Sequence, residues 1–330
     1  MTTKQSLLAQ LELHKGSVLS GEALATALCV SRTAIWKAVK DLQKAGYPID
    51  AVPHAGYTLS QNSDTLSAEA IRPLLHWHGG DVIVESCMDS TNTRAKQLAA
   101  AGAPHGTLVV ANEQTAGRGR RGRSFHSPAG SGLYLSMILR NSLPMESAAL
   151  VTSAAAVAVC HAVQSVCGLA LQIKWVNDLY KDGKKCCGIL TEASADFETG
   201  GVDYVVVGIG VNVREPAGGF PADIEKIATA LYAQEANVPR SRLAAAIANE
   251  VFALANTLPD TAFMAEYRAR NLIPGRDIFV LQNGTKRAAH ALNITDSGHL
   301  LVEFAGGDTE EISFGEVSIR LQSSYTGEKS

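Results

Sequence analysis

Residues 114–123 read Gln-Thr-Ala-Gly-Arg-Gly-Arg-Arg-Gly-Arg, so that four arginines alternate with three glycines. Glycines let a backbone approach a ligand closely, and exposed amides together with guanidinium groups bind carboxylates and phosphates. The apolar segments Val109–Ala111 and Leu133–Leu139 bracket this segment. We therefore interpret residues 117–123, which we call the arginine loop, as an ordered anion-binding loop. The alternative is a flexible arginine-glycine patch, which is usually found at a chain terminus.

The arginine loop matches neither of two common nucleotide-binding motifs. The chain contains no GxxxxGK[ST] segment, so the loop is not a Walker A loop. Gly117–Gly122 has the spacing of GxGxxG, but no ordinary helix pattern follows it, as a dinucleotide-binding site requires. The sequence therefore predicts an anion site of another kind.

The region from about residue 66 to 270 combines strand and helix patterns. Short apolar segments predict strands at Val82–Cys87, Thr107–Ala111, Leu133–Leu139, Leu171–Trp175, Cys186–Glu192 and Tyr204–Val213. Longer segments predict helices at Thr91–Ala101, Met145–Cys167, Arg240–Leu258 and Thr261–Asn271. Asp182-Gly183 lies between two of the strands as a hairpin turn, which indicates antiparallel pairing rather than a doubly wound parallel sheet.

The first sixty residues predict three short helices. Leu7, Leu8 and Leu11 share one face of the first helix, and Ser20 and Ser31 are N-cap residues for the second and third. About three residues separate the second and third helices, which is the turn length of a helix-turn-helix. Two short apolar segments follow, with a Pro-His-Ala-Gly turn between them, and predict a two-stranded wing.

The third helix has a polar face opposite its apolar one. This face carries the residues that we expect to contact DNA, which are Arg32, Thr33, Trp36, Lys37 and Lys40. A solvated face is the alternative, but the basic face, the short turn and the wing occur together and favour a DNA-binding winged helix-turn-helix. A connector rich in Ser, Asn and Asp, Ser60–Thr65, separates this part from the rest of the chain.

The chain from Pro274 onward predicts a separate β structure. Strands are expected at Asp277–Leu281, Arg287–Thr295, Leu300–Phe304 and Thr309–Phe314. Short strands at this spacing, joined by glycine-containing turns, suggest a small barrel.

The composition limits the possible function classes. The 330 residues are 46% hydrophobic and carry a net charge of −3, so the protein is globular and any DNA-binding surface must be local. No two of the six cysteines form a CxxC pair, so we predict no metal site. Ser147–Ile173 lacks charged residues but is interrupted by polar ones, which predicts a buried helix and no membrane partner. Glu12 and His14 stand where a signal peptide would be apolar, so we expect a cytoplasmic protein.

Three further polar clusters lie at strand ends and at a helix start. Lys174-Trp175-Val176-Asn177-Asp178 combines a lysine, an amide and a carboxylate, and Lys185 follows it across the hairpin. Asp89–Asn92 precedes a helix, and Gly208–Asn212 is a strand segment with two glycines, which suggests close approach of a ligand or of another backbone. Two simpler interpretations stay open here: lysines beside a turn commonly serve solubility, and Ser90 is a favourable helix N-cap.

In order and spacing, these segments resemble the signature of the biotin protein ligases. The matching segments are Asp89–Asn92, the arginine loop, Lys174–Asp178 followed by Lys185 and Gly188, and Gly208–Asn212. The N-terminal pattern makes the chain similar to the bifunctional branch of this family, which combines a biotin ligase with a biotin operon repressor. The resemblance spans essentially the whole chain, including the segment Gly315–Arg320.

The resemblance implies an α+β fold in three domains. Residues 1–63 would form the winged helix-turn-helix DNA-binding domain. Residues 64–270 would form the class II synthetase-like ligase core, with a central mixed or antiparallel sheet and helices. Residues 271–330 would form a small SH3-like β-barrel.

The resemblance also implies a role for each matching residue. The catalytic residues would be Arg118, Lys185 and Asp178. Biotin would be bound by Ser90, Thr91, Asn92, Gln114, Gly117, Arg118, Arg120, Lys185, Gly188 and Ile189. ATP would be bound by Arg118, Arg120, Arg121, Asn177 and Asn212.

Biotin and ATP are the implied substrates, and Mg²⁺ is expected with ATP although no protein ligand is assigned to it. Biotinyl-5′-AMP would form first, and its biotin would pass to a lysine of a biotin carboxyl carrier protein domain. Family members dimerise when biotinyl-5′-AMP orders their glycine-rich loops, which implies a homodimer on palindromic operator DNA.

The chain departs from the family pattern at a few positions. Val176 stands where many members have Pro, Phe125 stands where Trp is frequent, and no tryptophan follows Trp175. None of these departures removes a charged group. The alternatives are a ligand-sensing repressor with an inactive ligase core, a ligase with a non-functional DNA-binding domain, and a lipoate ligase. The retained charged residues argue against the first, and the arginine loop and the N-terminal domain argue against the last.

Overall fold

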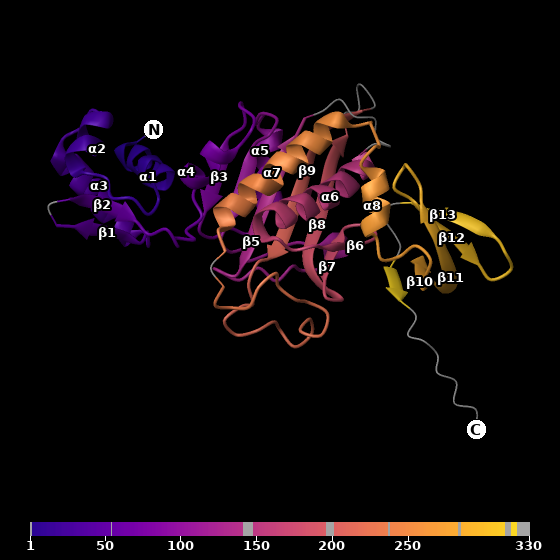
Figure 1. Ribbon diagram of the computed structural model, residues 1–330. Coiled ribbons are helices and arrows are strands. Elements are labelled where there is room, and N and C mark those ends of the chain that lie inside the picture. Colours follow the sequence, from indigo (N-terminus) through magenta and orange to yellow (C-terminus); the bar gives the residue numbers. More distant parts are fainter. Residues whose placement is uncertain are drawn as a thin grey trace.

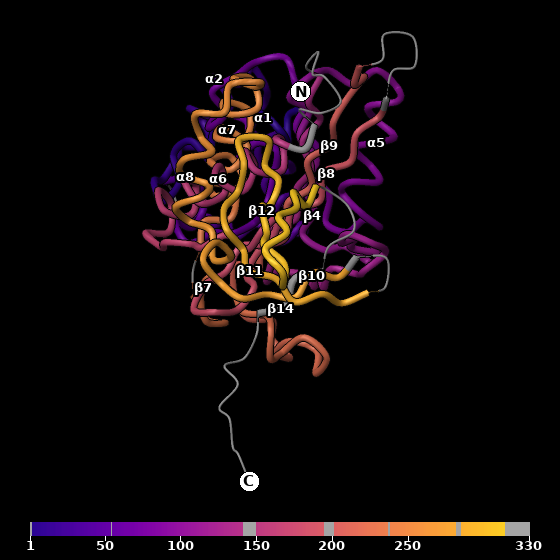
Figure 2. Tube along the Cα trace, turned by 90° about the vertical axis from the view of Figure 1, so that its right-hand side faces the viewer, coloured from indigo at the N-terminus to yellow at the C-terminus, as the bar shows by residue number. Residues whose placement is uncertain are grey.

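The computed structural model describes residues 2–53, 55–140, 148–195, 201–236, 238–282, 285–313 and 318–321. Figure 1 shows three parts in a row: an N-terminal group of helices with a small sheet, a central sheet covered by helices, and a C-terminal sheet. The view in Figure 2, along this row, shows the C-terminal strands in front of the central elements.

The N-terminal part is the predicted winged helix-turn-helix. Its elements are α1 (Thr3–Leu13), α2 (Gly21–Ala27), α3 (Arg32–Lys44), β1 (Ile49–Val52) and β2 (Gly56–Leu59). The hydroxyls of Ser20 and Ser31 accept hydrogen bonds from the backbone N–H of Ala23 and Ala34, which confirms both predicted N-caps. The strands β1 and β2 pair antiparallel as the wing, and Leu7, Leu8 and Leu11 are buried against α3.

The central sheet has seven strands in the order β3-β4-β5-β9-β8-β7-β6. Their bounds are β3 (Val82–Glu85), β4 (Leu108–Ala111), β5 (Gly132–Leu139), β6 (Gln172–Lys174), β7 (Asp178–Lys181), β8 (Lys184–Ala195) and β9 (Val202–Asn212). Among the pairings that the structure describes, β3 and β4 are parallel and the others are antiparallel. The sheet is therefore mixed and mostly antiparallel, as predicted.

Helices cover both faces of this sheet. The helix α5 (Thr91–Ala100) packs on β4, β5 and β9, and α6 (Ala148–Cys167) and α7 (Arg240–Thr257) pack together on the opposite face. Three short elements, α4 (Ala68–Ile71) and the 3₁₀ turns Arg72–Leu74 and Arg120–Gly122, complete this part, and α8 (Met264–Arg270) follows α7.

The helix α6 is apolar enough in length and composition to cross a membrane. However, 72% of the residues in its most apolar window, Leu150–Cys167, are buried inside the protein. Its small Ala and Val side chains let α7 approach closely, so that α6 is a helix of the core, as predicted. The predicted helix start at Met145 lies outside the described residues.

Two strands were not predicted from the sequence. The first, β7, begins and ends with charged residues, and its position is set by pairing with β6 and β8 rather than by an apolar pattern. The turn Asp182-Gly183 joins β7 to β8 with positive φ at both residues, 51° and 76°, as a tight hairpin requires. The second, β14 (Ser318–Leu321), pairs with the first C-terminal strand.

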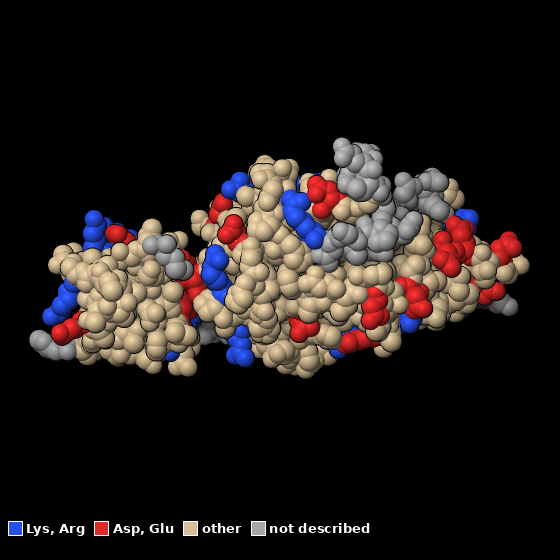
Figure 3. All heavy atoms as spheres, turned by 90° about the horizontal axis from the view of Figure 1, so that it is seen from above, with Lys and Arg blue, Asp and Glu red and all other residues tan. Residues whose placement is uncertain are grey.

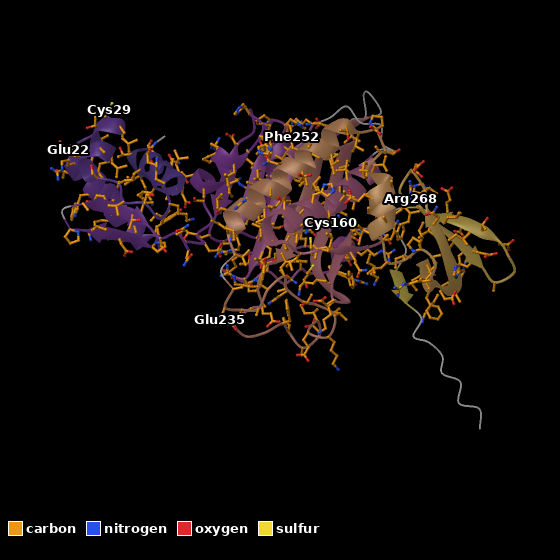
Figure 4. The ribbon with its side chains drawn as sticks, in the orientation of Figure 1. Glu22, Cys29, Cys160, Glu235, Phe252 and Arg268 are labelled. Atoms are coloured by element: carbon orange, nitrogen blue, oxygen red, sulfur yellow. The ribbon has the colours of Figure 1, made fainter. Side chains whose placement is uncertain are left out.

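The C-terminal strands form one antiparallel sheet in the order β13-β12-β11-β10-β14. Their bounds are β10 (Asp277–Gln282), β11 (Thr285–Ile294), β12 (Leu300–Phe304) and β13 (Thr309–Ile312), and the predicted strand end at Phe314 lies outside the described residues. The Trp175 indole Nε1 donates to the Gly298 carbonyl at 2.9 Å and Arg268, labelled in Figure 4, pairs with Asp296 at 2.7 Å. These bonds fasten the sheet to the core, whereas closure into an SH3-like barrel stays a prediction.

A histidine between two glutamates links the helices α6, α7 and α8. His161 Nδ1 lies 3.2 Å from Glu250 Oε2, and its Nε2 lies 2.8 Å from Glu266 Oε2. The other carboxylate oxygen of Glu266, Oε1, pairs with Arg270. Burial lowers the pKa of His161, but hydrogen bonds and charges of the two glutamates outweigh burial and raise this pKa above 6.5.

A pH-dependent stability follows for the variant His161→Gln. Because the pKa of His161 is raised in the folded state, its stabilisation is complete below pH 6.5 and is lost as the pH rises through the raised value. We expect the wild type to melt about 2 °C above the variant near pH 6 and at the same temperature near pH 9. Thermal unfolding measured at both values tests this, and an equal difference in melting temperature at both would contradict it.

Candidate functional site

Most of the residues predicted for the site line one cavity on the α5 side of the central sheet. The lining residues come from the start of α5, from the segment that follows β4, and from β8 and β9. The predicted residues that line it are Ser90, Thr91, Asn92, Gln114, Arg118, Arg120, Asn177, Lys185, Gly188 and Ile189. Arg121 and Asp178 line an adjoining cavity, and Asn212 lines a third that shares Lys185 and Phe125 with the first.

The polar wall of the cavity is a chain of hydrogen bonds. The Thr91 backbone N–H and hydroxyl donate to Gln114 Oε1 at 2.8 and 3.1 Å, and Gln114 Nε2 donates to Ser127 Oγ at 2.9 Å. The Ser136 hydroxyl lies 2.8 Å from Thr91 Oγ1 and 2.6 Å from Asn92 Oδ1. Sequence reasoning did not find Ser127 and Ser136, which stand in otherwise unremarkable positions of a loop and a strand.

Ser90 is the N-cap of α5, as the simpler interpretation held. Its Oγ accepts from the Thr93 N–H at 3.5 Å, and the residue is 2% exposed. Asn92, one residue after Thr91, donates to the Leu190 carbonyl and to Glu192 and is thereby held against β8. Ser90 and Asn92 therefore fix the start of α5 at the cavity.

Glu192 on β8 gathers three donors from different elements. Its carboxylate accepts from Lys96 Nζ at 2.7 Å and Asn92 Nδ2 at 2.9 Å, and it lies 3.3 Å from Arg118 Nη1. Burial raises the pKa of Glu192, but hydrogen bonds and charges of these neighbours outweigh burial and lower this pKa below 4.5. Glu192 is thus an anion that positions Arg118, and a lone glutamate in an apolar strand carries no signal for this role in the sequence.

Two cations lie on the other side of the cavity. Lys185 Nζ forms an ion pair with Asp178 Oδ1 at 2.6 Å across the β7–β8 hairpin. Arg120 Nη1 donates to Asn177 Oδ1 at 3.2 Å, and burial lowers the pKa of its guanidinium, although the charge of Asp178 opposes this. The pairing brings together the Lys174–Asp178 segment, the hairpin lysine and the arginine loop, as the sequence predicted.

The floor of the cavity is a patch of sheet without side chains. Gly188 of β8 and Gly210 of β9 are direct partners in the register, and the Phe125 ring lies over them. A Cβ atom added at Gly210 would lie 2.6 Å from Cε1 of this ring. Gly117 stands behind the cavity, where an added Cβ atom would meet the Phe125 carbonyl oxygen and, at 2.6 Å, Ser127 Oγ. These close approaches explain why glycine stands at positions 117 and 210.

The cavity lined by Asn212 is more apolar. Phe220, Ile224 and Ile227 also line it, and they belong to residues 215–231, in which no site residue was predicted. The Lys185 N–H donates to the Ile227 carbonyl at 2.8 Å, so this segment is attached directly to the strand that carries Lys185. An apolar cavity next to a row of cations suits a ligand with an aromatic ring and an anionic tail.

The predicted DNA-contacting residues of α3 all lie on its exposed face. Arg32, Thr33, Lys37 and Lys40 are exposed, and Trp36 is 54% exposed, which is unusual for so large an apolar side chain. In the view of Figure 3, Lys and Arg atoms appear at the outer end of the N-terminal part, away from the core.

The N-terminal and central parts of the chain each resemble known proteins. Residues 84–212 match the model of the biotin/lipoate A/B protein ligase family, and residues 3–58 match an HTH domain. The bifunctional ligase/repressor BirA of Bacillus subtilis is 40% identical over 232 residues, which cover 70% of this chain and 71% of that protein. The protein of the same description from Escherichia coli is 35% identical over 212 residues, covering 63% and 62%. Among solved structures, the biotin protein ligase from Aquifex aeolicus in complex with biotin and ATP matches with a TM-score of 0.62 and 26% identity, covering 73% of this chain and 99% of that one.

Proposed function

This chain belongs to the biotin protein ligase family, and we propose that it uses ATP to join biotin to a lysine of a carrier protein. The observation that carries the proposal is the cavity in which Thr91 and Gln114 face Lys185 and the arginine loop. The first pair supplies donors and acceptors for a polar ring, and the cations suit a carboxylate and phosphates. The cytoplasm, where ATP is available, is the proposed compartment.

The first half-reaction joins two anions. A carboxylate oxygen of biotin attacks the α-phosphorus of ATP, a P–O bond forms, and the bond to the leaving pyrophosphate breaks, which gives biotinyl-5′-AMP. Repulsion between the carboxylate and the phosphates opposes this step, so cations held in place before the reaction lower its barrier. Arg118, Arg120, Arg121 and Lys185 supply them, and Asn177 and Asn212 bind on the nucleotide side.

The second half-reaction transfers biotin to the carrier protein. A neutral lysine amine of the biotin carboxyl carrier protein domain attacks the acyl carbon, a C–N bond forms, and AMP leaves with the electron pair of the broken C–O bond. The amine must lose protons on the way, and Asp178 stands 2.6 Å from Lys185 in the same part of the site. Asp178 therefore orients or deprotonates the incoming lysine.

Mg²⁺ is proposed to accompany ATP, and no protein ligand is assigned to it. Among the residues that the structure describes, no three His, Cys, Asp or Glu side chains gather in a group that could hold a metal ion. The triphosphate oxygens are themselves good ligands for Mg²⁺. In such sites the ion is usually bound by phosphates and waters, with only one or two protein carboxylates. Bound to these oxygens, the ion would neutralise phosphate charge.

The N-terminal part adds repression to the ligase. A winged helix-turn-helix with Arg32, Thr33, Trp36, Lys37 and Lys40 on its exposed helix face suits the major groove of operator DNA. Biotinyl-5′-AMP acts as corepressor by ordering the arginine loop, which favours a homodimer on a palindromic site. We assign the DNA-binding domain to residues 1–63, the ligase core to 64–270 and the C-terminal barrel to 271–330.

Transfer of radiolabelled biotin to a carrier domain tests the ligase function. Label on the carrier that depends on ATP supports it, and DNA binding without transfer would instead favour a repressor with an inactive core. Footprinting on a biotin-synthesis promoter, with and without biotin and ATP, tests the repressor function. Absence of protection in both conditions would leave a ligase whose N-terminal domain does not bind DNA.

A change of Gly117 to Ala is expected to weaken biotin binding. The added Cβ atom would lie 2.6 Å from Ser127 Oγ and against backbone at Phe125. It would displace Ser127, which accepts a hydrogen bond from the Gln114 amide. Overpacking of about 1–3 kcal/mol corresponds to a rise in the Kd for biotin of about 5- to 150-fold, measurable by calorimetry.

Gly119→Ala is the matched control in the same loop. An added Cβ atom at Gly119 would lie 3.3 Å from the Arg123 carbonyl oxygen, a contact that a small shift relieves. We expect this variant to bind biotin within about threefold of the wild type. Equal affinities of the Gly117→Ala variant and the wild type would show that this close approach has no role in binding.

A further inference from the structure

A nearly buried ion-pair cluster joins the connector to the ligase core. The Asp64 carboxylate accepts from the Arg240 backbone N–H at 3.0 Å, from Arg240 Nε at 2.8 Å, and from Arg214 Nη2. The Arg240 side chain is 6% exposed, and its Nη1 donates to Asn112 Oδ1 and to the Gly132 carbonyl, both at 2.9 Å. One carboxylate on a short connector thus organises two arginines from distant segments of the core.

The connector is also held from the N-terminal side. Lys15, just after α1, donates from Nζ to the Ser63 carbonyl at 2.8 Å and pairs with Glu12 at 3.1 Å. The residue next to Asp64 is therefore attached to the winged helix-turn-helix. A displacement of that part pulls on the carboxylate that pairs with the two arginines.

Arg214 lies close in sequence to Asn212, which lines the more apolar cavity. It follows Asn212 by two residues, and it forms a bridge with Tyr232, whose N–H donates to the Val213 carbonyl at 3.0 Å. Residues 215–231, which we call the nucleotide loop, therefore begin and end at this bridge. Three apolar residues of this loop line the cavity next to Asn212.

The ion-pair cluster depends on the negative charge of the Asp64 carboxylate, which lies between Arg214 and Arg240. Without the Asp64 carboxylate, two guanidinium groups would face each other in a place where Arg240 has almost no access to water. An uncompensated charge of this kind is strongly unfavourable, so Arg214 would move away and take the base of the nucleotide loop with it. Arg214 lies two residues beyond the end of β9, whose last residue is Asn212.

We infer that Asp64 is a positioning residue for the ATP side of the active site, and that it couples the DNA-binding domain to nucleotide binding through Arg214. This inference rests on the proposed ligase function. Asp64 does not touch the cavity of Asn212, so it acts by holding Arg214 and the nucleotide loop. Because coupling is reciprocal, ATP binding in turn restrains the connector.

The kinetic test uses Asp64→Asn and Arg214→Gln in the full chain. Arg214→Gln leaves the Asp64–Arg240 pair intact, so it keeps the cluster folded if Asp64→Asn is unstable. We expect both variants to raise the KM for ATP about tenfold, within the range usual for coupled sites, with the KM for biotin within about twofold. Asp64→Glu keeps the charge and is expected to restore most of the ATP affinity.

Asp50→Asn is the matched control, because Asp50 is an exposed carboxylate on β1 of the same N-terminal part. We expect its KM values to equal those of the wild type. A purely structural role of the cluster would lower the amount of active enzyme and leave both KM values unchanged. That result, or an equal rise of both KM values, would overturn the inference.

Hydrogen exchange of the connector gives a readout that does not depend on catalysis. Addition of ATP and biotin is expected to slow exchange of the amides at residues 60–67 in the wild type and not in Arg214→Gln. Equal slowing in both proteins would overturn the coupling. Failure of the wild type to form biotinyl-5′-AMP would instead contradict the proposed function, and exchange measured with ATP alone would still test the coupling.

Discussion

Replacement of Lys185 by glutamine is expected to lower the rate of biotinyl-5′-AMP formation about 10²–10³-fold, as loss of one preorganised charged contact does in other enzymes. Lys185 Nζ lies 2.6 Å from Asp178 Oδ1 and lines all three adjoining cavities. It therefore stands where we propose that the biotin carboxylate and the α-phosphate meet. Glutamine keeps much of the length and a hydrogen-bond donor but removes the charge. Pyrophosphate release in a single turnover measures the rate.

Lys184→Gln provides the matched control for this substitution. Adjacent residues of a strand face opposite sides, and Lys184 is exposed with its Nζ directed to the Glu225 carbonyl at 3.2 Å. We expect the control to react at the wild-type rate. Equal rates for the two variants would remove Lys185 from the catalytic residues and return it to the role of a lysine that serves solubility.

Asp178→Asn is expected to slow the transfer of biotin from preformed biotinyl-5′-AMP by about 10²-fold, the low end for loss of a general base. Asparagine keeps the shape and can still accept a hydrogen bond, but it cannot take a proton from the attacking lysine. Adenylate formation is expected to fall less, because the cations that offset anionic repulsion stay in place. Separate assays of the two half-reactions distinguish these effects.

Asp182→Asn is the control for Asp178, since Asp182 lies on the same hairpin with its side chain 83% exposed. Its transfer rate is expected to match that of the wild type. Undiminished transfer in Asp178→Asn would eliminate this carboxylate as the group that orients or deprotonates the lysine. The nearby cations would then have to be sufficient for both half-reactions.

The parts of the fold with strong local signals could be predicted from the sequence. The N-caps Ser20 and Ser31, the Asp182-Gly183 hairpin and the Ala/Val-rich helix each follow from short-range chemistry, and each occurs in the structure. The strand β7 could not be predicted, because Asp178–Lys181 is extended only through its pairing with two neighbours. Tertiary pairing outweighs local propensity at such a strand.

The residues of the candidate site likewise fall into two groups, those with a local sequence signal and those whose role depends on tertiary structure. The arginine loop and the Lys174–Asp178 segment have an unusual composition, which makes them recognisable in the amino-acid sequence alone. Glu192 and Ser136 stand in ordinary strand sequences and Arg214 follows one, and their roles arise only where the fold brings α5, the arginine loop and the connector against them. The residues that we propose to bind a ligand were therefore easier to predict than the residues that position them.

Formation of the mixed anhydride, biotinyl-5′-AMP, is the most direct evidence for the proposed ligase activity. The purified protein is incubated with ATP labelled at the α-phosphate, with and without biotin, and the bound nucleotide is then separated. We predict one labelled biotinyl-5′-AMP per active site, formed only with biotin and with release of pyrophosphate, and discharged to AMP when a carrier domain is added. Labelled ATP that stays unchanged in the presence of biotin would contradict it.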